Sequence, residues 1–246
     1  MPQFFIKSSN LIENKCLIEG EDFRHLRKVR RVKPGDLIDL RIDNGLICKG
    51  KICTVNADSL TVEILETKEG NSAGPDLNLI LYASILKGKA FDFALQKAVE
   101  TGVSKIIPVV TERTIPVIER NSSRKARWEK IASAAAKQCM RKDIPVVADV
   151  ITFSEAVSKD RSGTKIIAHP EQRSIDIKQY FTQKEKTKDV SLLIGPEGGF
   201  TDKEVDLAEE NGWNSVIFGF TSLRAETASI VFPAIVIYEW SSAGGH

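Results

Sequence analysis

The first 70 residues carry short apolar runs that are separated by turn sequences. The connections include KPGD, DNG and NADS, which are typical of tight turns. Strand-like patterns of apolar side chains occupy residues 3–7, 16–20, 36–42, 45–55 and 59–66. Because so many short strands in so short a segment cannot bury a core as one open sheet, we predict a small closed β-barrel.

A helical pattern, EDFRHLRKVRRVK, interrupts these strands at residues 21–33. Phe23, Leu26 and Val29 or Arg30 recur at helical spacing and predict the buried face. The opposite face is basic, which favours contact with a nucleic acid, although a solvated surface helix is the alternative. Its members are Arg24, Arg27, Lys28 and Arg31.

Residues 68–76, KEGNSAGPD, are polar and rich in Gly and Pro, as expected of a linker. We therefore predict two domains, residues 1–70 and residues 75–246. Beyond the linker, apolar strand-like runs alternate with helical runs, which is the pattern of a parallel α/β sheet.

Two later segments of this α/β region carry helix signals. Thr201 and Glu204 predict a capping box at the start of a helix, and Gly212 predicts its end. Pro233 lies within the last apolar segment and predicts either a kink or a later helix start.

The composition is that of a globular chain without a targeting segment. It has 246 residues, 42% of them hydrophobic, and contains no run of about 18 apolar residues that would predict a membrane span. We therefore expect a cytoplasmic protein. The four cysteines lack metal-ligand spacing, so we expect free thiols and no metal site; they are Cys16, Cys48, Cys53 and Cys139.

Charge is unevenly distributed along the chain. Between residues 84 and 142 there are 13 Lys and Arg against five Asp and Glu, whereas from residue 190 onward two basic residues stand against eight acidic ones. This asymmetry indicates one surface that meets an anionic partner and another that does not.

Two loops of small residues follow apolar strands: LLIGPEGGF, residues 192–200, and FGFTSLRAETAS, residues 218–229. Ligands of open α/β sheets bind beyond the carboxyl ends of the strands, so both loops are candidates for one site. The first loop lacks the lysine of a triphosphate-binding loop, and no G-x-G-x-x-G follows any strand, which argues against ATP and NAD. An adenosyl-sulfonium ligand, held largely by backbone groups, fits better.

Several motifs together resemble the RsmE family of SPOUT methyltransferases. They are LLIGPEGGFTDKEV, SLRAETA, KGKAFDFALQKAVETGVSKIIPVVTERT, RWEKIASAAAKQCMRKDIP and, near the start, FRHLRKVRRVKPGD. The resemblance covers nearly the whole chain. It implies a PUA-like barrel, then an α/β domain with a C-terminal trefoil knot, and a homodimer with S-adenosylmethionine as cofactor.

The implied reaction is methylation of N3 of one uridine in the decoding region of small-subunit 16S ribosomal RNA. Two alternatives stay open at this point. One is a non-catalytic RNA-binding protein on the same scaffold, and the other is a methyltransferase of transfer RNA.

The resemblance also implies that three loops hold the cofactor. They are AHPEQ, GPEGGF and FGFTSLRAETA. The implied cofactor residues are His169, Pro170, Ile194, Gly195, Pro196, Glu197, Gly198, Gly199, Phe218, Gly219, Leu223, Arg224, Ala225, Glu226, Thr227 and Ala228.

Removal of the uridine N3 proton leaves a negative charge spread over O2 and O4. Arg224 is the candidate catalytic residue that stabilises this charge, because a guanidinium can donate to two acceptors at once. Glu226 is the second candidate and would orient Arg224 or help to take the proton. Its place at a helix N-terminus would equally explain an acid there. We assign His169 to cofactor binding rather than to base catalysis.

Contact with RNA is predicted for basic residues of both domains. In the long helical pattern after residue 122 they recur opposite an apolar face, with a solvated face as the alternative. The predicted set in the α/β domain is Lys87, Lys89, Arg127, Lys130, Lys137 and Arg141. Thr221, Ser222 and Met140 depart from the usual pattern of the family, which has a basic residue, an isoleucine and a glycine at these positions.

Overall fold

The computed structural model describes residues 4–6, 10–42, 46–69, 77–115, 122–139, 141, 143–170, 174–219 and 221–241. The chain forms two compact units. The first consists of residues 1–73 with 136–143, and the second of residues 74–135 with 144–246.

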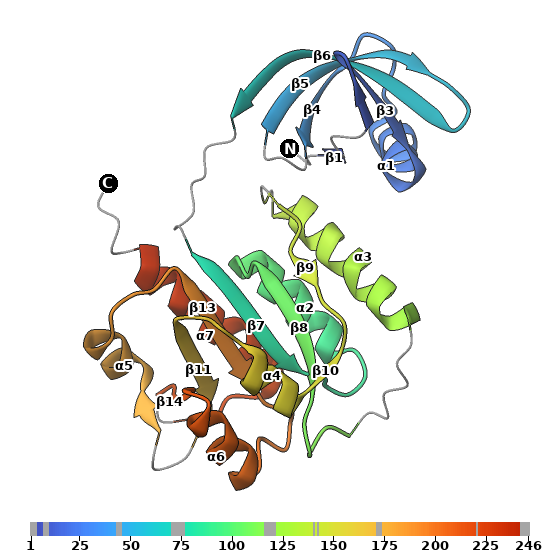
Figure 1. The fold of residues 1–246 in the computed structure, drawn as a ribbon. Helices are drawn as coiled ribbons and strands as arrows, with labels where there is room; N and C mark the ends of the chain where they lie inside the picture. The colour runs from blue at the N-terminus through green and yellow to red at the C-terminus, as the bar shows by residue number, and fades with distance from the viewer. Residues whose placement is uncertain are drawn as a thin grey trace. The chain divides into compact units, whose positions relative to one another are not determined.

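The first unit is built on a six-stranded sheet with the order β1-β4-β5-β6-β3-β2 (Figure 1). The end strand β1 runs parallel to β4, and the other pairs are antiparallel. The strands are β1 (Phe4–Ile6), β2 (Leu11–Ile12), β3 (Lys15–Glu19), β4 (Leu37–Ile42), β5 (Leu46–Val55) and β6 (Ser59–Glu69).

Chain connectivity requires this sheet to curl. The strands at its two ends, β1 and β2, are consecutive in sequence, and the path from Ile6 to Leu11 spans at most ~18 Å. A flat sheet of this order would separate its end strands by ~24 Å. The curled sheet encloses a core that includes Phe4, Leu40 and Leu60, as a small barrel does.

The basic segment of the first unit forms helix α1 (Gly20–His25), which continues as a π-helix, η2 (Leu26–Arg30). Phe23 and Leu26 are buried, as predicted, but the side chain of Val29 is 67% exposed. Of the two residues predicted to follow Leu26 on the buried face, Arg30 is half-buried and Val29 is not, because the N–H of Arg31 bonds to the carbonyl of Leu26, five residues back. This wider turn changes which residue follows Leu26 on the buried face.

The second unit contains a parallel sheet with the order β10-β8-β7-β13-β11-β14-β12, and β9 pairs with β8 (Figure 1). The predicted parallel α/β architecture is therefore confirmed. The strands are β7 (Asn78–Ser84), β8 (Lys105–Val110), β9 (Val146–Val147), β10 (Ile151–Thr152), β11 (Thr164–Ala168), β12 (Ile175–Asp176), β13 (Asp189–Ile194) and β14 (Asn214–Ile217).

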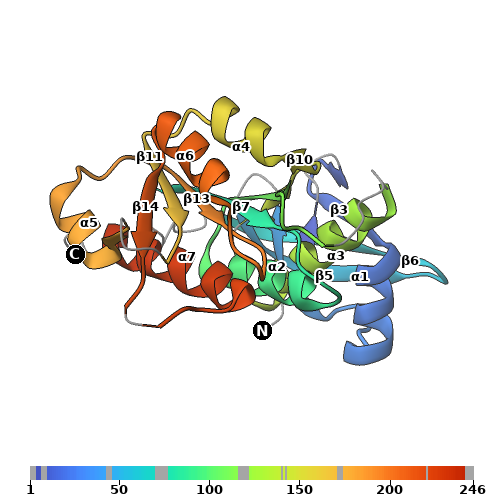
Figure 2. The same ribbon diagram turned by 90° about the horizontal axis from the view of Figure 1, so that it is seen from below.

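Helices cover both faces of this sheet (Figure 2). α2 (Ala90–Thr101) and α7 (Ala225–Ser241) pack together on one face, and α4 (Phe153–Lys159) and α6 (Asp202–Glu210) lie on the other. The remaining helices are α3 (Ser122–Gln138) and α5 (Ile177–Gln183). In the part of the chain that the structure describes, no helix is both long and apolar enough to cross a membrane.

The predicted helix signals have different outcomes. The capping box of α6 is present, with the Thr201 N–H donating to Glu204 at 3.0 Å, and Gly212 follows the helix with φ +81°. By contrast, α7 begins at Ala225 and runs through Pro233, so the expectation of a later helix start is wrong. The missing N–H of Pro233 leaves the carbonyl of Ser229 without its usual helical donor.

Candidate cofactor site

Three neighbouring strands of the second unit end at the same level. Ala168 of β11 is paired with Ile194 of β13 on one side and with Val216 of β14 on the other. Because all three strands are parallel, their following loops leave the sheet side by side at one edge. These are the three loops that were predicted to hold the cofactor.

The loops enclose a cleft of about 530 Å³ at this edge. Of the predicted cofactor residues, the cleft is lined by Pro170, residues 194–199, residues 223–226 and Ala228. The lining also includes Ala168 and Ser222, which belong to the loops predicted to hold the cofactor, and Ala90, which does not.

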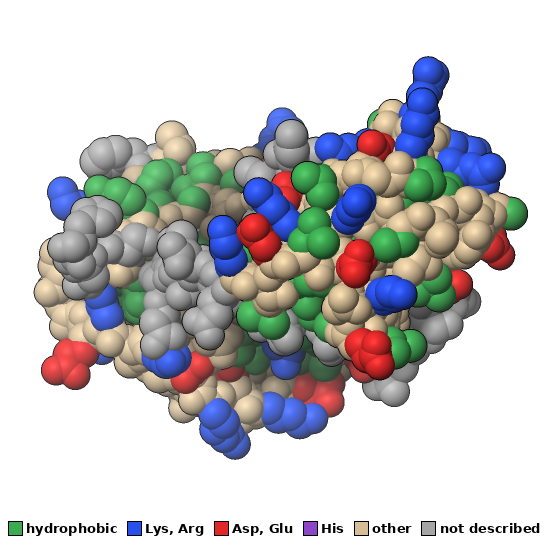
Figure 3. Space-filling model, turned by 90° about the horizontal axis from the view of Figure 1, so that it is seen from above, with side chains coloured by type: hydrophobic (Ala, Val, Ile, Leu, Met, Phe, Trp, Pro, Cys, Tyr) green, Lys and Arg blue, Asp and Glu red, His purple; other side chains and the backbone are tan. Residues whose placement is uncertain are grey.

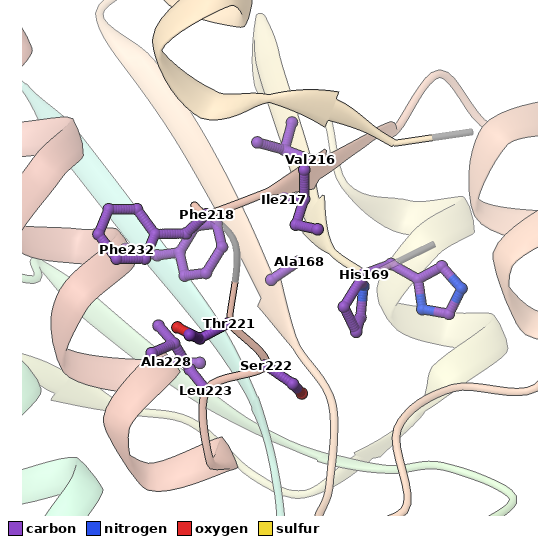
Figure 4. A pocket seen from close by; sticks show the side chains of 11 residues that line it. Ala168, His169, Val216, Ile217, Phe218, Thr221, Ser222, Leu223, Ala228 and Phe232 are labelled. Carbon is purple, nitrogen blue, oxygen red and sulfur yellow. The ribbon is translucent and has the colours of Figure 1, made fainter. Parts of the chain in front are cut away.

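A second cavity of about 60 Å³ lies between the loop after β11, the loop after β14 and helix α7 (Figure 4). Phe218 and Phe232 lie on one side of it, with ring centroids 6.4 Å apart, and His169 lies on the other. The two cavities share five lining residues, namely Ala168, Pro170, Ser222, Leu223 and Ala228.

Two predicted cofactor residues, Gly219 and Thr227, line neither cavity. Gly219 has φ +63°, so its conformation rather than contact with a ligand explains the glycine. Thr221 lines the smaller cavity and Ser222 lines both. The residues at 171, 172, 220 and 140 lie outside the described residues.

The glycine-rich loop after β13 is shaped by contacts of its own. Its turn is closed by the Gly199 N–H, which donates to the Pro196 carbonyl at 2.9 Å, and Gly199 has φ +68°. A Cβ on Gly195 would lie 3.1 Å from the ring of Phe200. The internal geometry of this loop therefore favours glycine at 195 and 199, independently of any ligand.

The loops after the next two strands of the sheet fasten this turn from outside. After β7, the Lys87 N–H donates to the Glu197 carboxylate at 2.9 Å. After β8, the Arg113 guanidinium donates to the carbonyls of Gly198 and Phe200 at 2.8 and 3.1 Å. Arg113 lies in the motif at residues 87–114 that carries the resemblance, but no role was predicted for it, because its partners lie more than 80 residues further along the chain.

Among the described residues, the ionisable groups that line the cleft are Glu197, Arg224 and Glu226. Arg224 is exposed and stands directly before α7, where its carbonyl accepts from the Ala228 N–H at 2.8 Å. Two carboxylates and one guanidinium suit a ligand with a net positive charge better than a polyphosphate. The chemistry of the lining therefore fits an adenosyl-sulfonium cofactor.

A buried polar network ties two strands of the sheet to the segment before β11. The Asp160 carboxylate accepts from Tyr82 of β7 at 3.1 Å and from Ser191 of β13 at 3.0 Å. Burial and the neighbouring carboxylate both raise the pKa of Tyr82 above its usual range. The tyrosine stays protonated, and together with Ser191 it fixes β7 and β13 to the end of α4.

The basic residues predicted to contact RNA fall into two groups. Exposed side chains stand at Arg24, Lys28, Arg31, Lys87, Lys89 and Lys130. The other four side chains bond to groups of the protein itself. Arg27 donates to the carbonyls of Asn56 and Ala57 at 3.3 and 2.5 Å. Ion pairs join Arg127 to Asp92, Lys137 to Asp22 at 2.6 Å and Arg141 to Asp143 at 3.0 Å. Arg141 also lies beyond the end of α3, so the predicted helical spacing does not extend to it. Figure 3 shows Lys and Arg side chains projecting at the upper right of the face it presents.

Comparison with known proteins agrees with these features. The family described as "RNA methyltransferase domain" matches residues 74–237, and "RNA methyltransferase PUA domain" matches residues 18–65. A ribosomal RNA small subunit methyltransferase E from Mesomycoplasma hyopneumoniae is 30% identical over 233 residues, which are 94% of this chain and 96% of the relative.

Solved structures extend the likeness to three dimensions. A ribosomal RNA small subunit methyltransferase E from Neisseria gonorrhoeae, bound to S-adenosyl methionine, is 32% identical with a TM-score of 0.87, and the match covers 98% of each chain. A putative methyltransferase from Legionella pneumophila in complex with the cofactor SAM is 28% identical with a TM-score of 0.88, covering 100% of this chain and 98% of the other. By sequence and by fold, the chain belongs to the family of the ribosomal RNA small subunit methyltransferases E.

Proposed function

We propose that this protein is an S-adenosylmethionine-dependent methyltransferase that modifies N3 of a uridine in the 16S ribosomal RNA of the small subunit. The observation that carries the proposal is the cleft at the ends of β13, β11 and β14. Small residues make up much of its lining, and among the described residues its ionisable groups are two carboxylates and one guanidinium.

The residues of the cleft have separate roles in this proposal. Bound S-adenosylmethionine supplies an electrophilic methyl group. The glycine-rich loop after β13 and the loop before α7 hold the adenosyl and methionyl parts through backbone groups. Arg224 stabilises the charge that develops on uracil O2 and O4 when N3 loses its proton. Glu226, in the first turn of α7, orients that guanidinium or accepts the proton.

Cofactor binding is tested by calorimetry with four ligands. We expect S-adenosylmethionine and S-adenosylhomocysteine to bind and ATP and NAD to give no signal, because none of the described residues that line the cleft is a lysine that could bind phosphate. Tight binding of ATP without binding of the adenosyl ligands would refute the cofactor assignment.

The substrate is tested by mapping modified nucleotides in RNA from cells that lack the gene. We expect one N3-methyluridine to be missing from 16S ribosomal RNA, with transfer RNA unchanged. Loss of a methyl group from transfer RNA instead would reassign the substrate, and an unchanged RNA population would favour a non-catalytic binding protein. Action on ribosomal RNA also implies a cytoplasmic location.

We further propose that the protein is a homodimer whose interface includes α7. Charged residues occur in this helix only at Glu226 and Glu239, and its exposed side includes Ala234 and Tyr238, the latter 69% exposed. An apolar helix face of this kind is stabilised by burial against a second subunit. Light scattering after gel filtration should give twice the mass of the chain. A monomer at micromolar concentration would contradict the proposal.

A further inference from the structure

Arg113 reaches the glycine-rich loop from outside the cleft. It lies in the segment 111–114 after β8 and donates through Nη1 to the carbonyl of Gly198 at 2.8 Å and to that of Phe200 at 3.1 Å. Its aliphatic stem lies 3.4 Å from where a Cβ on Gly198 would stand. Gly198 lines the cleft but Arg113 does not, so Arg113 supports the loop from behind.

The segment that carries Arg113 is itself fixed to the end of the same loop. The N–H of Glu112 donates to the buried carboxylate of Glu204 at 2.9 Å, and Thr201 Oγ1 donates to the Glu112 carboxylate at 3.2 Å. Within the segment, Thr111 and Thr114 bond to each other through backbone and side chain. Arg113 is therefore held on a rigid support.

The loop that it holds has little internal support of its own. Among the described residues, one backbone hydrogen bond closes the turn, from Gly199 to Pro196, and Gly199 has a positive φ. Two glycines in succession give this backbone many alternative conformations in the absence of external contacts. A guanidinium that donates to the carbonyls of Gly198 and Phe200, on either side of Gly199, selects one of these conformations.

We propose that Arg113 is a positioning residue that holds the 195–200 loop in the conformation that binds the cofactor. This inference rests on the proposed function. Arg113 acts through Gly198 and Phe200 and contributes no group to the cleft. Because apparent affinity falls with the fraction of protein in the binding-competent conformation, loss of Arg113 weakens cofactor binding even though the cleft residues are unchanged.

The chain offers a matched control for this residue. Arg161, at the end of α4, also donates through Nη1 to two backbone carbonyls, those of Ser158 at 2.9 Å and Asp160 at 3.1 Å. It lines neither cavity. Arg113→Ala and Arg161→Ala thus remove the same kind of contact at two places.

The test is a titration of full-length wild type and both variants with S-adenosylmethionine and S-adenosylhomocysteine, well below the unfolding temperature. We expect Arg113→Ala to weaken both ligands roughly tenfold and Arg161→Ala to change them less than about twofold. In methylation assays Arg113→Ala should raise the KM for S-adenosylmethionine by the same factor and leave kcat within about twofold. Should Arg113→Ala not fold, Arg113→Lys, which keeps the charge but not the planar fork, should show an intermediate loss.

Each outcome decides a different point. Wild-type affinity in Arg113→Ala, or in Arg113→Lys where that variant is needed, overturns the positioning role and leaves the proposed function intact. Equal losses in Arg113→Ala and Arg161→Ala overturn it as well, because they would reflect general destabilisation. Absence of binding by the wild type removes the proposed function and this inference with it.

Discussion

The cofactor cleft of the second unit and the basic α1–η2 segment of the first unit are built in opposite ways. The cleft is formed by loops that leave adjacent parallel strands at one level, and small residues make up much of its lining. The α1–η2 segment owes its character to charged side chains on a short helix. The position of the cleft is set by the topology of the sheet, whereas the character of the α1–η2 segment depends on which of its basic side chains already bond to the protein itself.

Arg27 shows the consequence of this difference. It belongs to the basic face by sequence, yet its guanidinium bonds to the carbonyls of Asn56 and Ala57 and lies 5.6 Å from the ring centroid of Phe23. A charged residue can thus be part of a basic pattern and still serve the fold.

The largest expected effect is that of Arg224→Ala, which removes the guanidinium that lines the cleft. Removal of a preorganised donor should lower the rate of methyl transfer by roughly 10² to 10³ and leave RNA affinity nearly unchanged. Single-turnover assays on small-subunit particles measure the rate, and filter binding measures the affinity. An unchanged rate would show that another group meets the charge on the uracil.

Gly199→Ala tests the backbone itself. At φ +68° an added Cβ should destabilise the present conformation of the loop by ~1 kcal/mol. If the loop relieves this strain by adopting another conformation, S-adenosylmethionine should bind about fivefold more weakly. Gly212→Ala is the matched control, because Gly212 has φ +81° after α6, and neither position has an atom within 4 Å of the added Cβ. Both should lose similar stability in thermal unfolding, but only Gly199→Ala should lose cofactor affinity. Equal affinities in calorimetry would contradict the role of this loop.

Substitutions in the α1–η2 segment should have two kinds of effect, because we expect some of its basic residues to contact RNA and one, Arg27, to support the fold. Arg24→Ala and Lys28→Ala should each weaken RNA binding about threefold and reduce the slope of log affinity against log salt by ~0.7 to 0.9. Arg27→Ala should instead lower the free energy of unfolding by ~1 kcal/mol, because it loses two carbonyl acceptors. Salt titrations and chemical unfolding distinguish the two. A salt slope lowered by Arg27→Ala alone would reverse the assignment.

The smallest expected effect concerns helix α4, which belongs to neither the cleft nor the α1–η2 segment. In the capping box of α4, the N–H of Thr152 and then Lys159 lower the pKa of Glu155 to about 2. A lowered pKa in the folded state contributes stability that is present above pH ~4.5 and is lost as pH falls towards 2. Glu155→Gln should therefore flatten the pH dependence of unfolding between these values, whereas Glu210→Gln, at an exposed position of α6, should not. Parallel curves for wild type and Glu155→Gln would refute the prediction.

The sequence predicted best those features that rest on local chemistry. The capping box of Thr201 and Glu204 and the buried side chains of Phe23 and Leu26 follow from spacing alone. The loops at 194–199 and 223–226 were predicted because strand ends in a parallel sheet meet at one edge. Each of these predictions needed only neighbours in sequence or a general rule of topology.

What the sequence did not predict depends on partners far along the chain. Ala90 lines the cleft because the loop after β7 is anchored to Glu197, a contact between residues 110 positions apart. Arg113 lies in a motif that carries the resemblance, but its role was not predicted, since its acceptors are backbone carbonyls that any sequence would offer. The engagement of Lys137 by Asp22 likewise joins residues that no periodicity relates.

The π-helix η2 has a consequence for insertions and deletions. It holds one residue more in its turn than an α-helix would, and the N–H of Arg31 closes it onto Leu26. Substitution changes the chemistry of a side chain here but not its direction. Deletion of Lys28 would convert the turn to ordinary α-helix and leave the flanking residues in nearly the same orientation, because four α-helical residues turn the chain by about as much as the five residues of the π turn. In this segment, the chain can therefore lose one residue without changing which of the flanking basic residues face solvent.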